Sequence, residues 1–130
     1  MSKLRAASRR RAKSIGEVLE RYFEAMRACD WPALAETLAA DVHRTGPYLD
    51  EVRGRDAYVE FLAGVIPKLP NYALDVARIR PIAAGGAVVE LSETIDRDGA
   101  RYRTPEALLF EFDATGRIAR VDVYIKRPPT

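Results

Sequence analysis

The chain has 130 residues, of which 48% are hydrophobic and 31% are charged, and its formal net charge is +2. This length fits one domain with a core of its own, and every apolar run is too short to cross a membrane. The single cysteine, Cys29, excludes an internal disulfide and is typical of a reducing compartment, so we expect a cytoplasmic protein.

The start of the chain differs in charge from the rest. Residues 1–13 hold six Lys or Arg and no acid, whereas residues 14–130 hold 15 basic and 19 acidic residues. We predict a flexible basic tail over 1–13, without the apolar stretch of a secretory signal, and a single domain over 14–130. Such a tail either makes a weak contact with nucleic acid or an anionic surface, or is merely solvated. The absence of aromatic residues among the charges favours the solvated tail.

Three helices are predicted in the first half of the chain. The Ser-x-x-Glu spacing of a capping box starts the first helix at Ser14. Asp30 can cap a second, short helix with Pro32 in its first turn, and Gly54 introduces a third, which ends at the prolines that follow. Their apolar residues recur at helical spacing and should form the helix side of the core: Ile15, Val18, Leu19, Tyr22, Phe23, Cys29, Trp31, Leu34, Tyr58, Phe61 and Leu62.

The apolar pattern changes to a period of two in the second half. A short strand is predicted over 41–45, and longer strands follow over 72–77, 88–97, 101–113 and 117–126. Asp98-Gly99 is the dipeptide that a two-residue hairpin prefers. Helices followed by a meander of strands indicate an α+β fold, with three helices packed on a curved, mixed and mainly antiparallel sheet.

The hairpin at Asp98-Gly99 sets which side chains share a face of the sheet. Glu93 should face Thr104, and Leu91 should face Glu106. If the next loop holds four residues, Phe112 pairs with Arg117 and Glu106 lies opposite Val123. Glu93 and Glu106 are then two carboxylates on the apolar face. They form either an acid/base pair in a pocket, or a structural ion-pair network or rim position.

Local phrases along residues 15–126 resemble the SnoaL-like branch of the nuclear transport factor 2 superfamily. The phrases are Val18-Leu19-Glu20-Arg21-Tyr22-Phe23, Asp30-Trp31, Asp41-Val42, Gly54-Arg55-Asp56-Ala57 and Gly116-Arg117-Ile118. The resemblance implies a cone-shaped α+β barrel with an apolar cavity. Such proteins include polyketide cyclases, ketosteroid isomerases, limonene epoxide hydrolases and proteins that only bind ligands or partners.

Catalytic positions of these enzymes match the chain only in part. Tyr22 matches the oxyanion tyrosine of ketosteroid isomerase, but the base position falls on Gly46 and the second acid position on Leu108. Asp96 matches one catalytic aspartate of limonene epoxide hydrolase, but Thr94 replaces the arginine. The hairpin register, in addition, places Asp96 on the polar face.

Arg44 occupies an inward position by the family match, and it can restore a carboxylate–arginine–carboxylate arrangement between Glu93 and Glu106. These three residues are the candidate catalytic groups. We expect Tyr22, Tyr102, Val123, Trp31 and Phe61 to contact the ligand, because they lie on the apolar faces. His43, beside Arg44, should point to the other face of its strand.

The function that follows is a pocket for a small apolar molecule. The pocket either performs acid/base chemistry on a polyketide-, steroid- or terpenoid-like compound, by isomerisation, cyclisation or epoxide hydrolysis, or only binds a ligand or mediates dimerisation. No metal-ligand spacing or nucleotide motif is present, so neither a metal nor another cofactor is expected. The resemblance also implies a homodimer paired through the outer face of the sheet.

Overall fold

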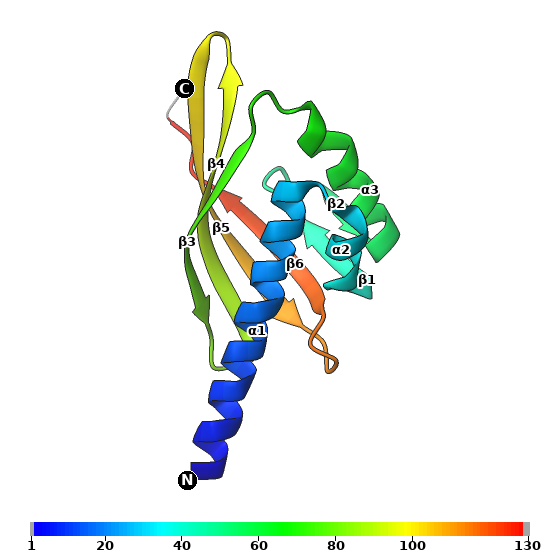
Figure 1. The fold of residues 1–130 in the computed structure, drawn as a ribbon, viewed down its shortest axis with the longest axis vertical. Coiled ribbons are helices and arrows are strands. Elements are labelled where there is room, and N and C mark those ends of the chain that lie inside the picture. Colours follow the sequence, from blue (N-terminus) through cyan, green and yellow to red (C-terminus); the bar gives the residue numbers. More distant parts are fainter. Residues whose placement is uncertain (1, 129–130) are drawn as a thin grey trace.

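Three helices lie on one side of a sheet in the computed structural model, which describes residues 2–128 (Figure 1). The helices are α1 (Ser2–Ala28), α2 (Trp31–Glu36) and α3 (Arg55–Val65), with a 3-10 turn, η1 (Ile66–Lys68), after α3. As the sequence predicts, Asp30 caps α2 through a hydrogen bond from the Ala33 amide (3.2 Å), and a proline lies in the first turn. Helices followed by strands confirm the α+β class.

The sheet has six strands in the order β2-β1-β6-β5-β4-β3. Only β1 and β6 run parallel, so the sheet is mixed and mainly antiparallel, as predicted. The strands are β1 (Leu38–Thr45), β2 (Glu51–Arg53), β3 (Ala73–Pro81), β4 (Gly86–Arg97), β5 (Ala100–Phe112) and β6 (Ile118–Ile125).

The sheet is curved, as the expected cone-shaped fold requires, and it does not close into a complete barrel. Among residues 2–128 the edge strands β2 and β3 do not pair with each other. The helices occupy the space between these edges, since α1 contacts β3 while α3 contacts β1 and β2 (Figure 1). The concave side of the sheet is therefore filled by helices, and one end of the cone stays open.

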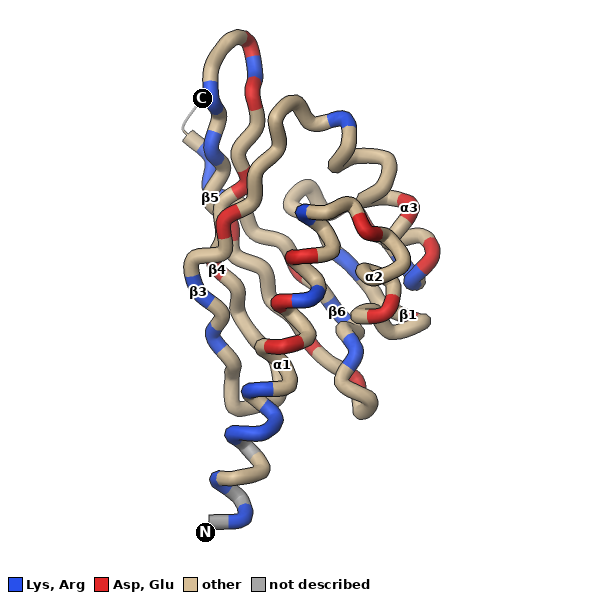
Figure 2. The backbone as a smooth tube through the Cα atoms, in the orientation of Figure 1, with Lys and Arg blue, Asp and Glu red and all other residues tan. Residues whose placement is uncertain are grey.

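Helix α1 begins at Ser2, so the prediction that it starts at Ser14 is wrong. The residues before Ser14 are mostly Ala, Leu, Arg and Lys, which favour a helix strongly enough to continue it past the capping sequence. Figure 2 shows this basic part of α1 projecting beyond the sheet. The predicted flexibility of the basic tail stays a prediction.

The core lies where α1 crosses the sheet. Tyr22 and Phe23 of α1 meet Phe110 of β5 edge to face, with ring centroids 5.5 and 6.0 Å apart. All three side chains are buried, and each contributes about 1.5–3 kcal/mol by leaving water. Arg27 fixes the end of α1, because its Nε donates to the Leu74 carbonyl of β3 (3.0 Å). Cys29 follows α1 with a φ of 53° and is exposed, so its expected place in the core is wrong.

The β4–β5 hairpin has the predicted register. Asp98 and Gly99 have φ values of 52° and 79°, which is the conformation of a two-residue type I′ turn. Glu93 pairs with Thr104, and Leu91 pairs with Glu106.

The register between β5 and β6 differs from the expected one. Phe112 pairs with Ile118 instead of Arg117, because the ladder shifts between Glu111 and Phe112. Beyond this irregularity the pairing is displaced by two residues, so Glu106 lies opposite Ile125 and not Val123. A displacement of two keeps each side chain on its face, and Val121, Val123 and Ile125 still point inward.

Candidate functional site

A small cavity lies between α1, α3 and the concave face of the sheet. Its volume is about 50 Å³, and it adjoins a wider pocket of about 510 Å³ at the end of the sheet near the β4–β5 turn. The two share the lining residues Arg44, Glu93, Glu106 and Val123. Apolar side chains form most of the remaining inner wall: Phe23, Met26, Leu62, Ile66, Leu74, Leu91 and Leu108.

Glu106 is the most perturbed acid of this cavity. Burial raises the pKa of Glu106 to about 9, and a side-chain hydrogen bond with Glu93 and the charge of Glu93 act in the same direction. The charge of Arg44 acts in the opposite direction. The Oε2 atom of Glu106 is buried and has no hydrogen-bond partner among the described residues. Glu106 therefore holds a proton at neutral pH and carries an oxygen with free hydrogen-bonding capacity.

Tyr72 connects Glu93 to the wall of the pocket. Its hydroxyl donates a hydrogen bond to Glu93 Oε2 and lies 3.7 Å from Met26 Sδ. Burial, followed by the charge of Glu93, raises the pKa of Tyr72 well above its usual value, so its hydroxyl remains a donor. The alternation of residues 72–76 placed Tyr72 on the face of Leu74, but nothing in the sequence indicated its partner.

Two tyrosine hydroxyls form another hydrogen bond deeper in the cavity. The hydroxyl oxygens of Tyr22 on α1 and Tyr58 on α3 are 2.5 Å apart, and both side chains are buried. Burial raises the pKa of both, so both hydroxyls stay protonated. Two neutral hydroxyls share one hydrogen bond, which leaves the second hydroxyl proton for another acceptor.

Arg44 lies in the cavity wall but does not bridge the two acids. Its Nη1 makes an ion pair with Asp50 Oδ2 (3.4 Å), and its guanidinium stacks over the Phe61 ring at 4.8 Å. No ion pair joins Arg44 to Glu93 or Glu106 in the part of the chain that the structure describes, so the expected carboxylate–arginine–carboxylate arrangement is wrong.

Asp50 reaches Arg44 because of a tight turn between β1 and β2. The Gly46 amide donates to the Asp50 carbonyl at 2.7 Å, and a side chain at Gly46 would collide with the Asp50 carboxylate. The sequence predicted that the strand ends at residue 45 and gave no sign of this pairing. Arg44 thus acts on Glu106 through its charge and not through a contact.

The ligand-contact predictions have different outcomes. Tyr22 and Val123 line the enclosed cavity, and Tyr102, which is 42% exposed, lines the wider pocket. Phe61 touches neither space but supports Arg44. Trp31 packs against the core at the start of α2 and lies outside both linings, so its predicted ligand contact is not supported by its position.

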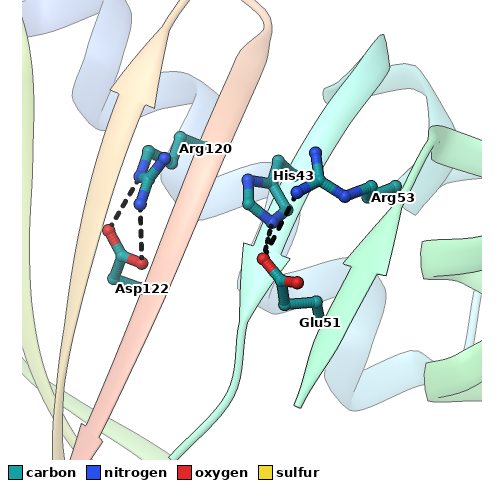
Figure 3. Close-up of polar contacts among 5 residues, drawn as sticks. All are labelled: His43, Glu51, Arg53, Arg120 and Asp122. Carbon is teal, nitrogen blue, oxygen red and sulfur yellow. Dashed lines mark hydrogen bonds and ion pairs between the residues drawn. The ribbon is translucent and has the colours of Figure 1, made fainter. Parts of the chain in front are cut away.

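Other polar residues lie on the convex face of the sheet (Figure 3). His43 Nε2 is 2.9 Å from Glu51 Oε1, which also pairs with Arg53 at 3.4 Å. Arg120 contacts Asp122 through two nitrogen–oxygen pairs, at 3.0 and 3.5 Å.

Asp96 and His43, for which the sequence predicted an outward position, both lie away from the cavity. Asp96 pairs with Arg101 (2.9 Å) on the exposed side, as the register predicts and the epoxide hydrolase match does not. His43 likewise faces away from the cavity that Arg44 lines.

The described residues 2–128 contain neither a candidate metal cluster nor a helix that could cross a membrane. No three side chains among His, Cys, Asp and Glu are grouped as a metal site would require. None of the helices has the length and apolar character that a bilayer crossing needs.

The model of the SnoaL-like domain matches residues 19–121. Bal32a from a soil-derived mobile gene cassette has a similar structure, with 18% identity, 88% of this chain and 91% of that chain covered, and a TM-score of 0.77. The epoxide hydrolase/cyclase-like enzyme SalBIII, described for pyran ring formation in the polyether salinomycin, shares 17% identity over 88% of this chain and 92% of its own, with a TM-score of 0.76.

An NTF-2 like protein of unknown function from Burkholderia xenovorans LB400 shares 21% identity over 92% of this chain and 88% of its own, with a TM-score of 0.75. A search of curated proteins found no match. At these identities, the structural likenesses show the fold alone. The domain model, however, covers most of the sequence, including α3 and all strands but the end of the last, and the chain therefore belongs to the family of SnoaL-like domain proteins.

Proposed function

We propose that the protein performs acid/base chemistry on a small, largely apolar compound of the polyketide, steroid or terpenoid kind. The observation that carries this proposal is the protonated carboxyl of Glu106 in an apolar cavity, beside Glu93. An acid that keeps its proton at neutral pH is suited to donate it to a substrate oxygen, and pairs of carboxyls with separated pKa values divide the acid and base roles.

The two carboxyls can act together in one reaction. Glu106 gives its proton to a carbonyl or epoxide oxygen of the substrate, while Glu93 removes a proton from an adjacent carbon, or from the water or hydroxyl that attacks the epoxide. The proton gained by Glu93 then passes to the neighbouring Glu106, which restores the starting state. Epoxide hydrolysis and cyclisation by attack of a hydroxyl on an epoxide follow this scheme. In an isomerisation, Glu93 instead returns its proton to another carbon of the enol, and Glu106 recovers its proton from the enol oxygen. None of these proton transfers needs a cofactor.

Neighbouring groups adjust this exchange. The Tyr72 hydroxyl, which donates to Glu93, stabilises the negative charge of Glu93 and so favours a single shared proton. Arg44 limits the rise of the Glu106 pKa. The Tyr22–Tyr58 pair offers a hydroxyl donor to a polar group of a substrate that reaches the inner end of the cavity. SalBIII, a structural relative described as epoxide hydrolase/cyclase-like, makes ring formation one reasonable member of the reaction class.

Ligand binding without catalysis is the second candidate function. The small volume of the inner cavity, about 50 Å³, favours it, because a compound of several rings would have to lie mostly in the outer pocket. Under either function, we propose a cytoplasmic homodimer paired through the convex face of the sheet, where Tyr124 is 62% exposed.

The experiment that tests the catalytic proposal compares Glu106→Gln with Glu111→Gln. Both acids lie on β5, but Glu111 is exposed and belongs to the convex face. Carbon-13 titration of the glutamate carboxyls should find one midpoint near 9 in the parent and in Glu111→Gln, and none in Glu106→Gln. Opening of methylcyclohexene oxide and conversion of a β,γ-unsaturated cyclohexenone should then be lost only in Glu106→Gln. A Glu106 midpoint near the usual 4.5 would refute the acid role.

A further inference from the structure

The wall of the outer pocket has an unusual balance of charge. Five basic residues and only two acids line it, although residues 14–130 as a whole contain more acids than bases. The two acids, Glu93 and Glu106, lie at its inner end, where it meets the enclosed cavity. The basic residues of the lining are Arg44, Arg97, Arg103, Lys126 and Arg127.

The basic residues at the mouth of this pocket lack the acidic partners found elsewhere on the sheet. Within the described residues, Arg97, Arg103, Lys126 and Arg127 make no ion pair. Several basic residues elsewhere on the sheet are paired: Arg78 with Glu90 (2.7 Å), Arg101 with Asp96 (2.9 Å), and Arg120 with Asp122 (3.0 Å). The mouth therefore gathers four basic residues that make no ion pair.

Two of these cations are held in place by aromatic rings. Arg97 stacks on Tyr102 with its guanidinium carbon 5.7 Å from the ring centroid, and Arg127 stacks on Tyr48 at 4.5 Å. Stacking uses the face of a guanidinium and leaves the edge N–H groups free to donate to a planar anion. The tyrosines are exposed, at 42% and 65%, and line the same pocket.

Three segments that are distant in sequence bring these residues together. Tyr48 comes from the turn between β1 and β2, Arg97 and Tyr102 come from the β4–β5 hairpin, and Arg127 follows β6. Figure 2 shows basic segments near the hairpin and the C-terminal end on the same side of the molecule, away from the projecting start of α1. The mouth thus has its own positive field, separate from the basic part of α1.

We infer that the ligand of this pocket is an amphiphilic anion, with an apolar body between the apolar walls and a carboxylate or sulfonate group held by Arg97 and Arg127. This inference rests on the proposed pocket function and adds the charge class of its ligand. A neutral ligand would make no use of these cations. An anionic head at the mouth also orients the apolar body toward Glu93 and Glu106 at the inner end.

The test uses a pair of dyes that differ in one charged group. Anilinonaphthalene sulfonate is an apolar fluorophore with one negative charge, and phenylnaphthylamine is its neutral parent. Their affinities for the full chain are measured by fluorescence titration at low salt. The variants are the double substitution Arg97→Gln/Arg127→Gln and the control Arg9→Gln/Arg10→Gln, which removes the same charge from the exposed, projecting part of α1.

The mouth variant should weaken the sulfonate dye roughly tenfold and change the neutral dye by less than about twofold, because two charge-assisted contacts are lost. The control should change neither dye by more than about twofold, since Arg9 and Arg10 lie on the projecting start of α1 and do not line the pocket. Arg97→Lys/Arg127→Lys should keep most of the sulfonate affinity. Val123→Trp, which fills the junction of the two spaces, should weaken both dyes.

Each other result contradicts a defined part of the argument. Suppose that the neutral dye binds, while the mouth variant weakens the binding of both dyes equally, or of neither dye. In either case the inference of an anionic ligand is wrong, but the pocket still binds apolar molecules. Sulfonate binding that survives Val123→Trp lies outside the pocket and also overturns the inference. If neither dye binds the parent, the pocket for apolar molecules is refuted, and the inference fails with it.

Discussion

Glu93 and Glu106 lie diagonally across β4 and β5, since Glu93 pairs with Thr104 and Glu106 pairs with Leu91. Both carboxyls point to the concave face, and the proximity of Glu93 raises the pKa of Glu106. Because the two carboxyls interact, the pair holds one proton at neutral pH. The interaction of these two carboxyls determines how the free energy of unfolding depends on pH. It also determines how substitutions of Arg44 and Tyr72 act.

Stability should fall as the pH rises from 4.5 toward 9. Glu106 has a pKa of about 9 in the folded protein and a usual value of 4.5, so between these values the folded state binds a proton that the unfolded state releases. The free energy of unfolding should therefore decrease by up to about 1.4 kcal/mol per pH unit, with no further loss from this group above the folded pKa. Urea denaturation across this range should show the decrease in the parent and in Glu111→Gln. If the free energy of unfolding of Glu106→Gln decreased equally over this pH range, the decrease would come from groups other than Glu106.

Replacement of Arg44 by Met should have two effects. The free energy of unfolding should decrease by about 1–2 kcal/mol, because the contact with Asp50 and the stacking on Phe61 are lost. The midpoint of the Glu106 titration should rise, because the charge of Arg44 lowers that pKa. Arg53→Met is the control, since Arg53 is 71% exposed and should change neither quantity measurably. An unchanged Glu106 midpoint in Arg44→Met would mean that water screens this charge.

Replacement of Tyr72 by Phe removes the hydroxyl that donates to Glu93. A hydrogen bond to a charged group contributes about 1.5–3 kcal/mol, so the free energy of unfolding should decrease by about that amount. Tyr124→Phe removes an exposed hydroxyl and should have almost no effect. Equal stability of the two variants in thermal or urea melts would show that Glu93 does not depend on Tyr72.

Trypsin should remove the start of α1 before it cuts the domain. The basic residues there are exposed, and a helical segment of this length is marginal without packing. Brief digestion should therefore trim the chain to near Lys13 and leave a folded core, as followed by mass spectrometry and circular dichroism. Arg27, on the same helix, is bonded to the Leu74 carbonyl and should survive. Protection of the Arg9–Arg11 run would contradict this prediction.

The proposed homodimer should be visible by sedimentation at tens of micromolar, the range of moderately weak association. Tyr124 is an exposed aromatic on the convex face, so Tyr124→Glu should shift the population toward monomer. The control Leu49→Glu changes a loop residue that is 86% exposed, and it should leave the proportion of monomer unchanged. A parent that sediments as a monomer at these concentrations would refute the dimer.

The sequence predicted best those features that depend on neighbouring residues. Asp98 and Gly99 determine a turn, the turn determines the β4–β5 register, and the register places Glu93 and Glu106 on one face. The shift between Glu111 and Phe112 was not predictable in this way, because a ladder irregularity leaves the alternation of apolar residues intact.

Contacts between segments distant in space were predicted less well. The inward position of Arg44 followed from the family match, but its partner Asp50 depends on the path of the turn after Gly46. The start of α1 was misplaced for a different reason. The capping sequence at Ser14 competes with the strong helix preference of the preceding residues, and a local motif does not reveal which of the two prevails.

Four residues line both the enclosed cavity and the outer pocket: Arg44, Glu93, Glu106 and Val123. A substitution at any of them alters the space for a ligand and the surroundings of the shared proton at the same time. Descendants of this sequence that acquire new ligands should therefore diverge first at Ile95, Tyr102 and Thr104, which touch only the outer pocket. Ligand range can then change by single steps, while the proton chemistry is inherited unaltered.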